Sequence, residues 1–405
     1  MAQLRHRGDA MNIDGIDQLA EPADSPVLAE LRTTCPVSRT PNGAWFLARN
    51  ADVLAATKDV HTFRASFREP GVVVPDEEQL INEIPEPRHG EVRKVINSAI
   101  AAHKITRMEG FCRELSNELL DDLLGREGVI DLVHDYVMPI PNNVIAELLG
   151  AKREDFNKWA AWSDEVVQGS WPTQNRNERG EGLAGAHPEF TAYVDELIRE
   201  RKESPKDDFI TRLINTEIDG RRLTDIETRT QLVFLFISGN ETTRHLISNL
   251  LWTIVNNPTI ERALRENSDL INNAIEESLR YDPPVKLLMR NCEQETQVHG
   301  ETMCPRDKVA FGILSANRDE NLYDEPHEFR LDRPSPRNHL GFGGGPHVCP
   351  GAALARLEAR VAVEEFLRRV SSFEVLEPGV YDEVPVFWAR GPAHLKVRLS
   401  PAAID

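Results

Sequence analysis

The stretch FGGGPHVCPG, residues 342–351, tells more about the fold than any other part of this 405-residue chain. Its three consecutive glycines permit a tight turn in which backbone N–H groups point inward. The residues that follow, Ala352–Arg360, have the apolar spacing of an amphipathic helix. Cys349 is therefore expected just before a helix N-terminus, where free amides and the helix dipole favour the thiolate. A thiolate held in a glycine-rich turn suits a soft or borderline metal.

The residue pattern of this stretch also allows three other interpretations. A lone cysteine is most often a small buried hydrophobic side chain. The glycines could cradle a dinucleotide phosphate, but Gly341-x-Gly343-x-x-Pro346 lacks the third glycine and no hydrophobic strand leads into it. A zinc site is disfavoured because His347 and Cys349 offer two ligands and no second pair stands nearby. Other parts of the sequence are needed to choose between these interpretations and a metal-binding thiolate.

Composition and charge narrow the class of protein. Charged residues make up 28% of the chain and hydrophobic residues 40%, as in ordinary globular proteins. The formal net charge of -19 argues against a nucleic-acid binder. No apolar run approaches the roughly 18 residues of a membrane helix, and the N-terminus shows no secretion signal. The five scattered cysteines form neither a disulfide framework nor a zinc site. A cytoplasmic protein without a membrane span is expected.

Helical periodicity dominates the chain. The predicted helices cover Thr106–Leu124, Asp155–Gln168, Glu189–Glu203, Asp225–Asn256 and Leu354–Val370. The fourth is unusually long, about 45 Å at 1.5 Å per residue. Thr224 provides its capping start and Pro258 lies just beyond its end. Because this helix is apolar on most sides, it is expected in the core.

Strand signals are fewer. The predicted strands cover Ala44–Ala48, Thr296–Val298, Lys308–Phe311, Val384–Trp388 and His394–Leu399. No long linker and no internal repeat is present. The chain is therefore predicted to form one domain over residues 1–405, mainly helical with small sheets, with residues 1–20 as a poorly ordered N-terminal segment.

The hexapeptide SGNETT, residues 238–243, interrupts the apolar surface of the long helix. Gly239 leaves room for a close approach to the backbone, at a cost of about 1 kcal/mol compared with alanine. Thr242 can donate its hydroxyl to the carbonyl of Ser238 and open a small polar groove. Glu241 beside it is expected to exchange protons with solvent. By itself, however, a threonine pair in a core helix more often only satisfies its own hydroxyls.

These stretches resemble conserved segments of the bacterial cytochrome P450s. Residues 342–351 look like the cysteine-ligand loop F-G-x-G-x-H-x-C-x-G, and the following GAALARLE is similar to the helix after it. Residues 238–243 resemble A-G-x-[D/E]-T-T, with Ser238 in place of the usual alanine. The resemblance covers most of the chain. It implies the P450 fold, a triangular, helix-rich single domain with a long central helix over a haem.

Two further pairs match that family in the expected order. Glu277 and Arg280 read as E-x-x-R, and the resemblance gives both a structural role in bonding to residues 317–333. His89 and Arg93 resemble the family's H-x-x-x-R. With Arg290 and His347, they would bind the two haem propionates through charge-assisted hydrogen bonds. Taken singly, each of these residues is more often a surface group.

The resemblance implies haem b with Cys349 as the axial ligand of the iron, in a loop shaped by Phe342, Gly343 and Gly351. The implied activity is that of a monooxygenase, which inserts one oxygen atom from O2 into a C–H bond of a small apolar substrate. Glu241, Thr242 and Gly239 are the expected catalytic residues. The expected substrate pocket includes Phe67, Val74, Leu235, Leu288 and Phe387.

The electron donors are expected to be separate proteins, a ferredoxin and a ferredoxin reductase, because no such module follows residue 349. Several cations could form a docking face for an acidic ferredoxin, although a solvated helical face is the alternative. These cations are Arg88, His89, Arg93, Lys94, His103, Lys104, Arg107, Arg356 and Arg360.

Two alternative functions keep the haem but change the activity. One is a peroxide-driven or rearranging haem-thiolate enzyme, and the other is a non-catalytic haem-binding sensor. The first tends to lack the acid–alcohol pair that Glu241 and Thr242 provide here. The second needs neither a proton relay nor a docking face.

Overall fold

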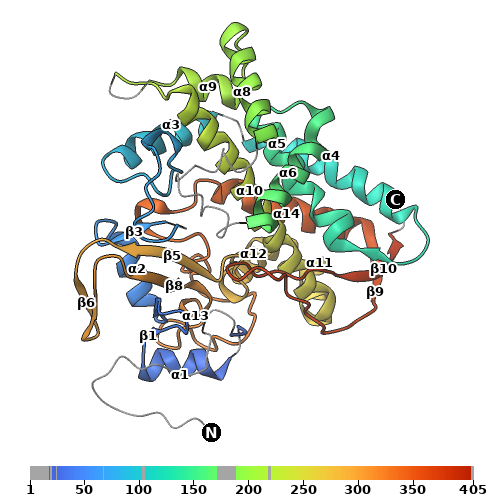
Figure 1. Ribbon diagram of the computed structural model, residues 1–405. Coiled ribbons are helices and arrows are strands. Elements are labelled where there is room, and N and C mark those ends of the chain that lie inside the picture. Colours follow the sequence, from blue (N-terminus) through green and yellow to red (C-terminus); the bar gives the residue numbers. More distant parts are fainter. Residues whose placement is uncertain are drawn as a thin grey trace. The chain divides into compact units, whose positions relative to one another are not determined.

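The computed structural model describes residues 18, 21–23, 25–66, 68–102, 105–170, 188–217 and 220–402 (Figure 1). The predicted N-terminal segment 1–20 lies almost wholly outside them. The chain forms two compact units. Unit 1 comprises residues 1–71, 276–349 and 385–390, and unit 2 comprises residues 72–275, 350–384 and 391–405. The predicted single-domain organisation stays a prediction.

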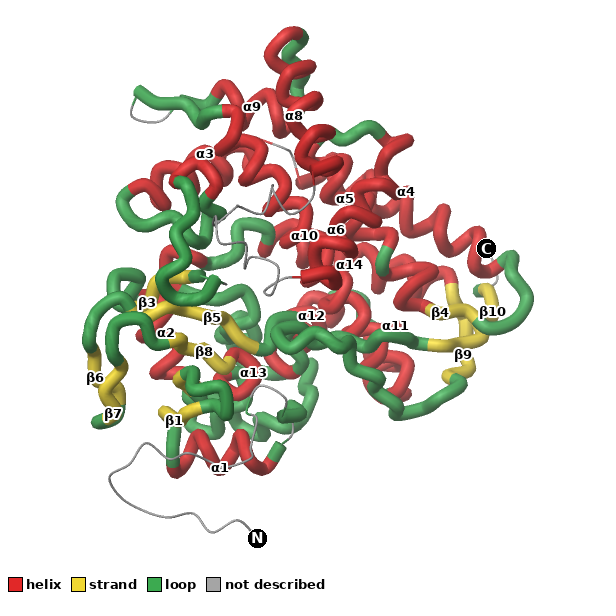
Figure 2. The backbone as a smooth tube through the Cα atoms, viewed as in Figure 1, coloured by secondary structure: helices red, strands yellow, loops and turns green. Residues whose placement is uncertain are grey.

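Unit 1 is built on a five-stranded sheet of order β1-β2-β8-β5-β3. The strands are β1 (Val37–Arg39), β2 (Trp45–Leu47), β8 (Lys308–Gly312), β5 (Leu287–Cys292) and β3 (Phe63–Ala65). β2 pairs with β8 in parallel, and the other neighbours are antiparallel. Figure 2 shows long loops between these short strands. Because β2 and β3 both pair with strands more than 200 residues later, the sheet depends on contacts distant in sequence.

Short elements complete unit 1. They are α1 (Pro26–Thr34), α2 (Asn50–Lys58), α13 (Ile313–Ala316), the turn η5 (Gly345–His347) and the hairpin of β6 (Thr296–Val298) and β7 (Glu301–Met303). The C-terminal half of α12 (Leu270–Tyr281) also belongs to this unit. Its core includes Trp45, Leu47 and Phe311, all at most 2% exposed.

Unit 2 is mainly helical. Its helices are α3 (Arg88–Ala102), α4 (Ile105–Leu124), α5 (Pro139–Leu149), α6 (Phe156–Ser170), α8 (Pro188–Glu203), α9 (Phe209–Asn215), α10 (Asp225–Asn256), α11 (Pro258–Glu266) and α14 (Ala352–Arg369), with the short η1 (Asp76–Glu78), η2 (Val133–Val137) and η3 (Arg153–Asp155). A three-stranded antiparallel sheet has the order β4-β10-β9, with β4 (Ile130–Asp131), β10 (Lys396–Pro401) and β9 (Val370–Val375).

The long helix α10 has the bounds that the sequence predicts. At its start, the Thr224 hydroxyl accepts from the N–H of Glu227, and the Glu227 carboxylate accepts from the N–H of Thr224. This capping box satisfies two of the amides that a helix leaves unpaired at its first turn. α10 packs against α5, α8 and α14, and most of its side chains are buried. It is therefore the core helix of unit 2.

The predicted class, mainly helical with small sheets, is confirmed. All five predicted helices are present, with ends that agree to within two residues. The predicted strand Val384–Trp388 is wrong, since this segment has only isolated bridges at its flanks, at Glu383 and Ala389. Pro385 lacks the N–H that a paired strand needs there. No helix within the described ranges is long and apolar enough to cross a membrane.

Candidate active site

The loop around Cys349 lies in unit 1 and is closed by its own backbone. The N–H of Cys349 donates to the carbonyl of Phe342 across 2.9 Å. Gly343 and Gly345 have φ values of 73° and 62°, a conformation that side chains with a Cβ atom rarely adopt. Cys349 is half-buried, and α14 begins three residues later at Ala352. The loop therefore presents the cysteine immediately before a long helix, as its sequence predicts.

Close packing of the loop against α2 also requires glycine at two positions. A Cβ atom on Gly344 would lie 2.7 Å from Oγ1 of Thr57, and one on Gly345 would lie 2.3 Å from the Thr57 carbonyl oxygen. Neither distance leaves room for a methyl group. The glycine run thus permits the turn and also lets the loop pack closely against α2. The sequence indicated only the turn.

Arg290 is a buried cation on β5 of the same unit. It is 7% exposed, donates to the carbonyl of Met289 across 2.8 Å and lies 5.1 Å from the ring centre of Phe311. Burial lowers the pKa of its guanidinium to about 10. No carboxylate within the described ranges forms an ion pair with it. Because a buried charge is costly unless it is paired, Arg290 fits an anionic group such as a haem propionate.

Glu277 and Arg280 form the centre of a buried network in unit 1. Two nitrogens of Arg280 donate to the two oxygens of Glu277, across 2.7 and 2.9 Å. Arg333 donates to both oxygens as well, each across 2.9 Å. Glu277 is fully buried, and Arg280 and Arg333 are 1% and 6% exposed.

The two arginines extend this network to the backbone of residues 317–333. Arg280 donates to the carbonyls of Asn317, Pro326 and Glu328. Arg333 donates to the carbonyls of Asp324, Glu325 and Glu328. These are the contacts that the E-x-x-R resemblance implies, with Arg333 as a third charged member that the sequence did not single out. One carboxylate thereby organises the irregular segment that leads to the cysteine loop.

In unit 2, the predicted catalytic hexapeptide lies in the middle of α10. The hydroxyl of Thr242 donates to the carbonyl of Ser238 across 2.9 Å, as its spacing predicts. At Gly239, the group that comes close is Ile145 of α5, because a Cβ atom on this glycine would lie 3.0 Å from its Cδ1. The glycine therefore permits close packing of α5 on α10.

The surroundings of Glu241 differ from the sequence expectation of exchange with solvent. Its side chain is 3% exposed and forms ion pairs with Arg244, one turn later, and with Nε2 of His245 across 3.0 Å. Burial alone would raise the pKa of Glu241. The combined effect of His245 and Arg244 lowers this pKa by more than burial raises it, so the net shift is downward. Burial also lowers the pKa of His245, against the opposing effect of Glu241. An ionised carboxylate thus lies beside a neutral imidazole.

Sequence reasoning missed His245, although its spacing from Glu241 was visible. Residues four apart on a helix are neighbours, but the spacing does not reveal burial. In the structure, His245 is 1% exposed, and a Cβ atom on Gly391 would lie 2.2 Å from its Nδ1. The ring is therefore enclosed by the chain after β9 as well as by α10.

His89 and Arg93 lie one turn apart on α3 of unit 2. His89 is 2% exposed, and its Nδ1 lies 2.8 Å from a carboxylate oxygen of Glu86. Nε of Arg93 donates to the side chain of Asn97 across 3.2 Å. Since Arg290 and His347 belong to unit 1, the convergence of these four residues on one group stays a prediction.

The predicted pocket residues have different surroundings. Phe67 lies outside the described residues. Val74 is buried, Leu235 on α10 is half-buried, and Leu288 on β5 packs against the core of unit 1. Phe387 is 43% exposed. Their common role as a substrate pocket stays a prediction.

Several cations of the predicted docking face are already paired within unit 2. Arg88 forms an ion pair with Glu227, and Arg360 forms ion pairs with Glu109 and Glu364. His89 is buried, and His103 and Lys104 lie outside the described residues. Lys94 and Arg107 are exposed. Neighbouring carboxylates thus neutralise Arg88 and Arg360, and a docking face made by the other cations stays a prediction.

Comparisons with known proteins identify the family of the chain. A sequence model of the family described as Cytochrome P450 matches residues 52–383. The erythromycin C-12 hydroxylase of Saccharopolyspora erythraea is 34% identical, over 89% of this chain and 91% of that protein. The steroid C26-monooxygenase of Mycolicibacterium smegmatis is 29% identical, over 100% and 99%.

A solved structure gives the same result for the fold. Cytochrome P450 CYP109Q5 from Chondromyces apiculatus is 31% identical and superposes with a TM-score of 0.83, covering 93% of this chain and 95% of that one. The family model covers most of the chain, and both this solved structure and the erythromycin hydroxylase are more than 30% identical to it. The chain belongs to the cytochrome P450 family of haem-thiolate monooxygenases.

Proposed function

We propose that this enzyme binds haem b and inserts one oxygen atom from O2 into a C–H bond of an apolar small molecule. The observation that carries the proposal is the acid–alcohol pair of α10, in which Thr242 bonds to the Ser238 carbonyl beside the buried Glu241 carboxylate. Such a pair is suited to delivering protons at a defined place in a core helix. A haem-binding sensor has no need of it.

Cys349 is proposed as the axial thiolate of the iron, in the loop shaped by Phe342, Gly343 and Gly351. When bound, the haem supplies the oxygen chemistry, and the thiolate tunes it. The uncompensated charge of Arg290 supports a role in binding a propionate, together with His347, His89 and Arg93. Glu277 and Arg280 are proposed to act structurally, by holding the segment before the loop.

Proton delivery is assigned to Glu241 and Thr242, with Gly239 keeping the helix closely packed. His245 and Arg244 favour the ionised form of Glu241. Because its resting form is the carboxylate, Glu241 has to accept a proton before it can deliver one. His245, 3.0 Å away, is the adjacent group able to exchange that proton.

The names of two relatives support a large ring compound as substrate, since one acts on erythromycin and the other on a steroid. The pocket proposed for it includes Val74, Leu235, Leu288 and Phe387, and also Phe67. A ferredoxin and its reductase are proposed as electron donors. The exposed Lys94 and Arg107 are the cations best suited to attract an acidic ferredoxin.

The test combines spectroscopy with turnover. The reduced protein should give the carbon monoxide spectrum of a thiolate-ligated haem, and Cys349→Ser should abolish it. With ferredoxin and reductase, NAD(P)H consumption should depend on an apolar ring substrate. Thr242→Ala should divert most of the electrons to hydrogen peroxide.

Two results would contradict the proposal. An absence of substrate-dependent consumption with every ring compound tested would favour a sensor. Product formation from peroxide alone, at the same rate in the wild type and Thr242→Ala, would favour a peroxide-driven enzyme.

A further inference from the structure

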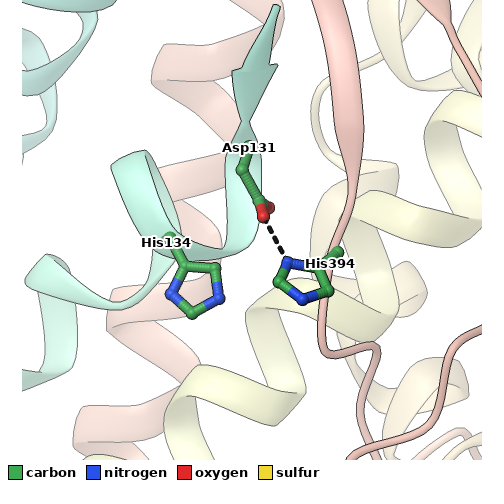
Figure 3. A group of neighbouring side chains, drawn as sticks. All are labelled: Asp131, His134 and His394. Carbon is green, nitrogen blue, oxygen red and sulfur yellow. Dashed lines mark hydrogen bonds and ion pairs between the residues drawn. The ribbon is translucent and has the colours of Figure 1, made fainter.

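Two imidazoles and a carboxylate gather at the surface of unit 2, and none of the three residues has a role in the function proposed above. They belong to Asp131 at the end of β4, His134 in η2 and His394 just before β10. One ligand atom of each lies within 4.8 Å of the others. Figure 3 shows the rings of His134 and His394 next to each other, with the Asp131 carboxylate between and above them. His394 follows His134 by 260 positions in sequence, so the fold has brought it to the other two residues.

The carboxylate is held in place by bonds that leave one oxygen for the cluster. Oδ1 of Asp131 accepts from the N–H groups of Val133, across 3.1 Å, and Leu395, across 3.0 Å. Oδ2 accepts from Nδ1 of His394 across 2.6 Å. Bonds from the backbone to a ligating carboxylate fix its orientation, as in established metal sites.

The backbone around the two histidines is fixed as well. The N–H of Leu132 donates to the carbonyl of Leu395 across 2.9 Å, and Lys396 of β10 pairs with Asp131 of β4. His134 lies in η2, a π-helical turn, an irregularity that often marks functional sites. The N–H of Asp131 donates to Asp135, which also pairs with Arg126. The ligand set is therefore largely preorganised.

We propose that Asp131, His134 and His394 form a binding site for a divalent cation of borderline softness, with Zn²⁺ as the representative ion. One carboxylate and two imidazoles are a ligand set that such ions prefer. Zn–N and Zn–O bonds of about 2.0–2.1 Å place two ligands of one ion at most about 4.2 Å apart. Small side-chain rotations are therefore enough to close the site.

The proposed ligands are accessible to solvent. The side chain of His394 is 48% exposed and that of Asp131 is 19% exposed. An ion can therefore enter from water and keep water in its remaining positions. Binding replaces the hydrogen bond between His394 and Asp131 by two bonds to the metal. Because the ligands come from β4, η2 and the segment just before β10, the ion would tie these three segments together and raise their stability by mass action.

Zinc titration of the full-length, haem-loaded enzyme tests the site. After chelator treatment and dialysis, calorimetric titration with ZnCl2 should give one site that is tighter than any other binding. His134→Ala and His394→Ala should each weaken it at least about ten-fold. Zinc should raise the melting temperature of the wild type but not of these variants.

Two matched variants separate a metal site from a structural aspartate–histidine pair. Asp131→Asn keeps the hydrogen-bonding shape but offers a poor ligand, so it should fold and lose zinc affinity. His299→Ala removes a histidine of a similar exposed pair, with Asp52, and should leave the titration unchanged. Equal zinc affinity in the wild type and Asp131→Asn, or no binding below about 1 mM, would overturn the proposal.

Discussion

His245 is 1% exposed and lies 3.0 Å from a carboxylate oxygen of Glu241, and the two residues shift each other's pKa in opposite directions. Burial is the largest effect on the histidine and lowers its pKa, whereas Glu241 opposes that shift. In the unfolded chain, a histidine titrates near pH 6.5. Below that pH, the unfolded state binds a proton that the native state does not, so folding loses stability as the pH falls.

Replacement of His245 should therefore flatten the dependence of stability on pH. In the wild type, this residue adds a slope of up to about 1.4 kcal/mol per pH unit, from about pH 6.5 down to its lower native pKa. His245→Gln should remove that slope. The lowered pKa of Glu241 acts in a separate, more acidic window, because its stabilisation is lost as the pH falls below the ordinary carboxylate range. Urea unfolding at pH 7.5, 6.5 and 5.5 measures the difference.

The matched control for this experiment is His299→Gln, at a histidine that is 41% exposed. It shows how much of any change in slope comes from losing a histidine that the fold does not enclose. An unchanged slope in His245→Gln would mean that the buried ring does not keep its neutral form.

Arg290 should affect the haem-free and the haem-loaded protein in opposite ways. Its buried charge has no carboxylate partner in the described part of the chain, so Arg290→Leu should stabilise the haem-free form. The same change removes the proposed charge-assisted bond to a propionate, of about 1.5–3 kcal/mol. Haem transfer to apomyoglobin should therefore become about 10- to 100-fold faster. Unaltered haem loss, with Arg398→Leu as the surface control, would count against that bond.

At the scale of elements, the Glu277 network ties α12 to the irregular segment 317–333. Glu277→Gln would leave Arg280 and Arg333 as buried charges without their common counter-ion. Loss of one partner of a buried pair costs about 3–5 kcal/mol. The exposed pair Glu374 and Arg398 offers a control, since Glu374→Gln should cost less than about 1 kcal/mol. Denaturant unfolding of both variants measures the contrast, and similar losses would refute it.

The long helices could be predicted because their signals are local. The Thr224 and Glu227 cap of α10 and its apolar pattern lie within the helix itself. The strands β3 and β5 could not be predicted from the sequence. Phe63 of β3 pairs with the distant Cys292 of β5, and neither short segment shows a clear alternation of apolar and polar residues. Pairing between distant segments depends on the whole fold, and spacing along the chain does not report it.

In the candidate site, too, the local features could be predicted from the sequence and the features that depend on packing could not. The hydrogen bond from the Thr242 hydroxyl to the Ser238 carbonyl could be predicted, because the two residues are four apart in one helix. Sequence reasoning missed that Glu241 is enclosed, because burial comes from α10 packing against other elements. It likewise indicated the glycines of the cysteine loop but not the contact with Thr57 that requires two of them.

At the scale of the whole molecule, the net charge of -19 makes each exposed cation important for an acidic partner. Lys94→Glu combined with Arg107→Glu should slow association with an acidic ferredoxin about ten-fold at low ionic strength, with the difference shrinking as salt is added. Stopped-flow reduction at several salt concentrations measures the rates. Arg262→Glu changes an exposed cation of α11. Because this control changes the net charge by half as much, an effect half as large on the logarithm of the rate would show that only total charge matters.

Unit 1 is assembled from three stretches of chain, residues 1–71, 276–349 and 385–390. Trp45 in β2 bonds to Asp307, which follows it by 262 residues. During translation at about 5–20 residues per second, β1 and β2 leave the ribosome roughly 10 to 50 seconds before β8 is available. In that interval, their unpaired edges and apolar side chains are open to aggregation. Protection of these first strands by chaperones during synthesis should therefore raise the yield of folded enzyme.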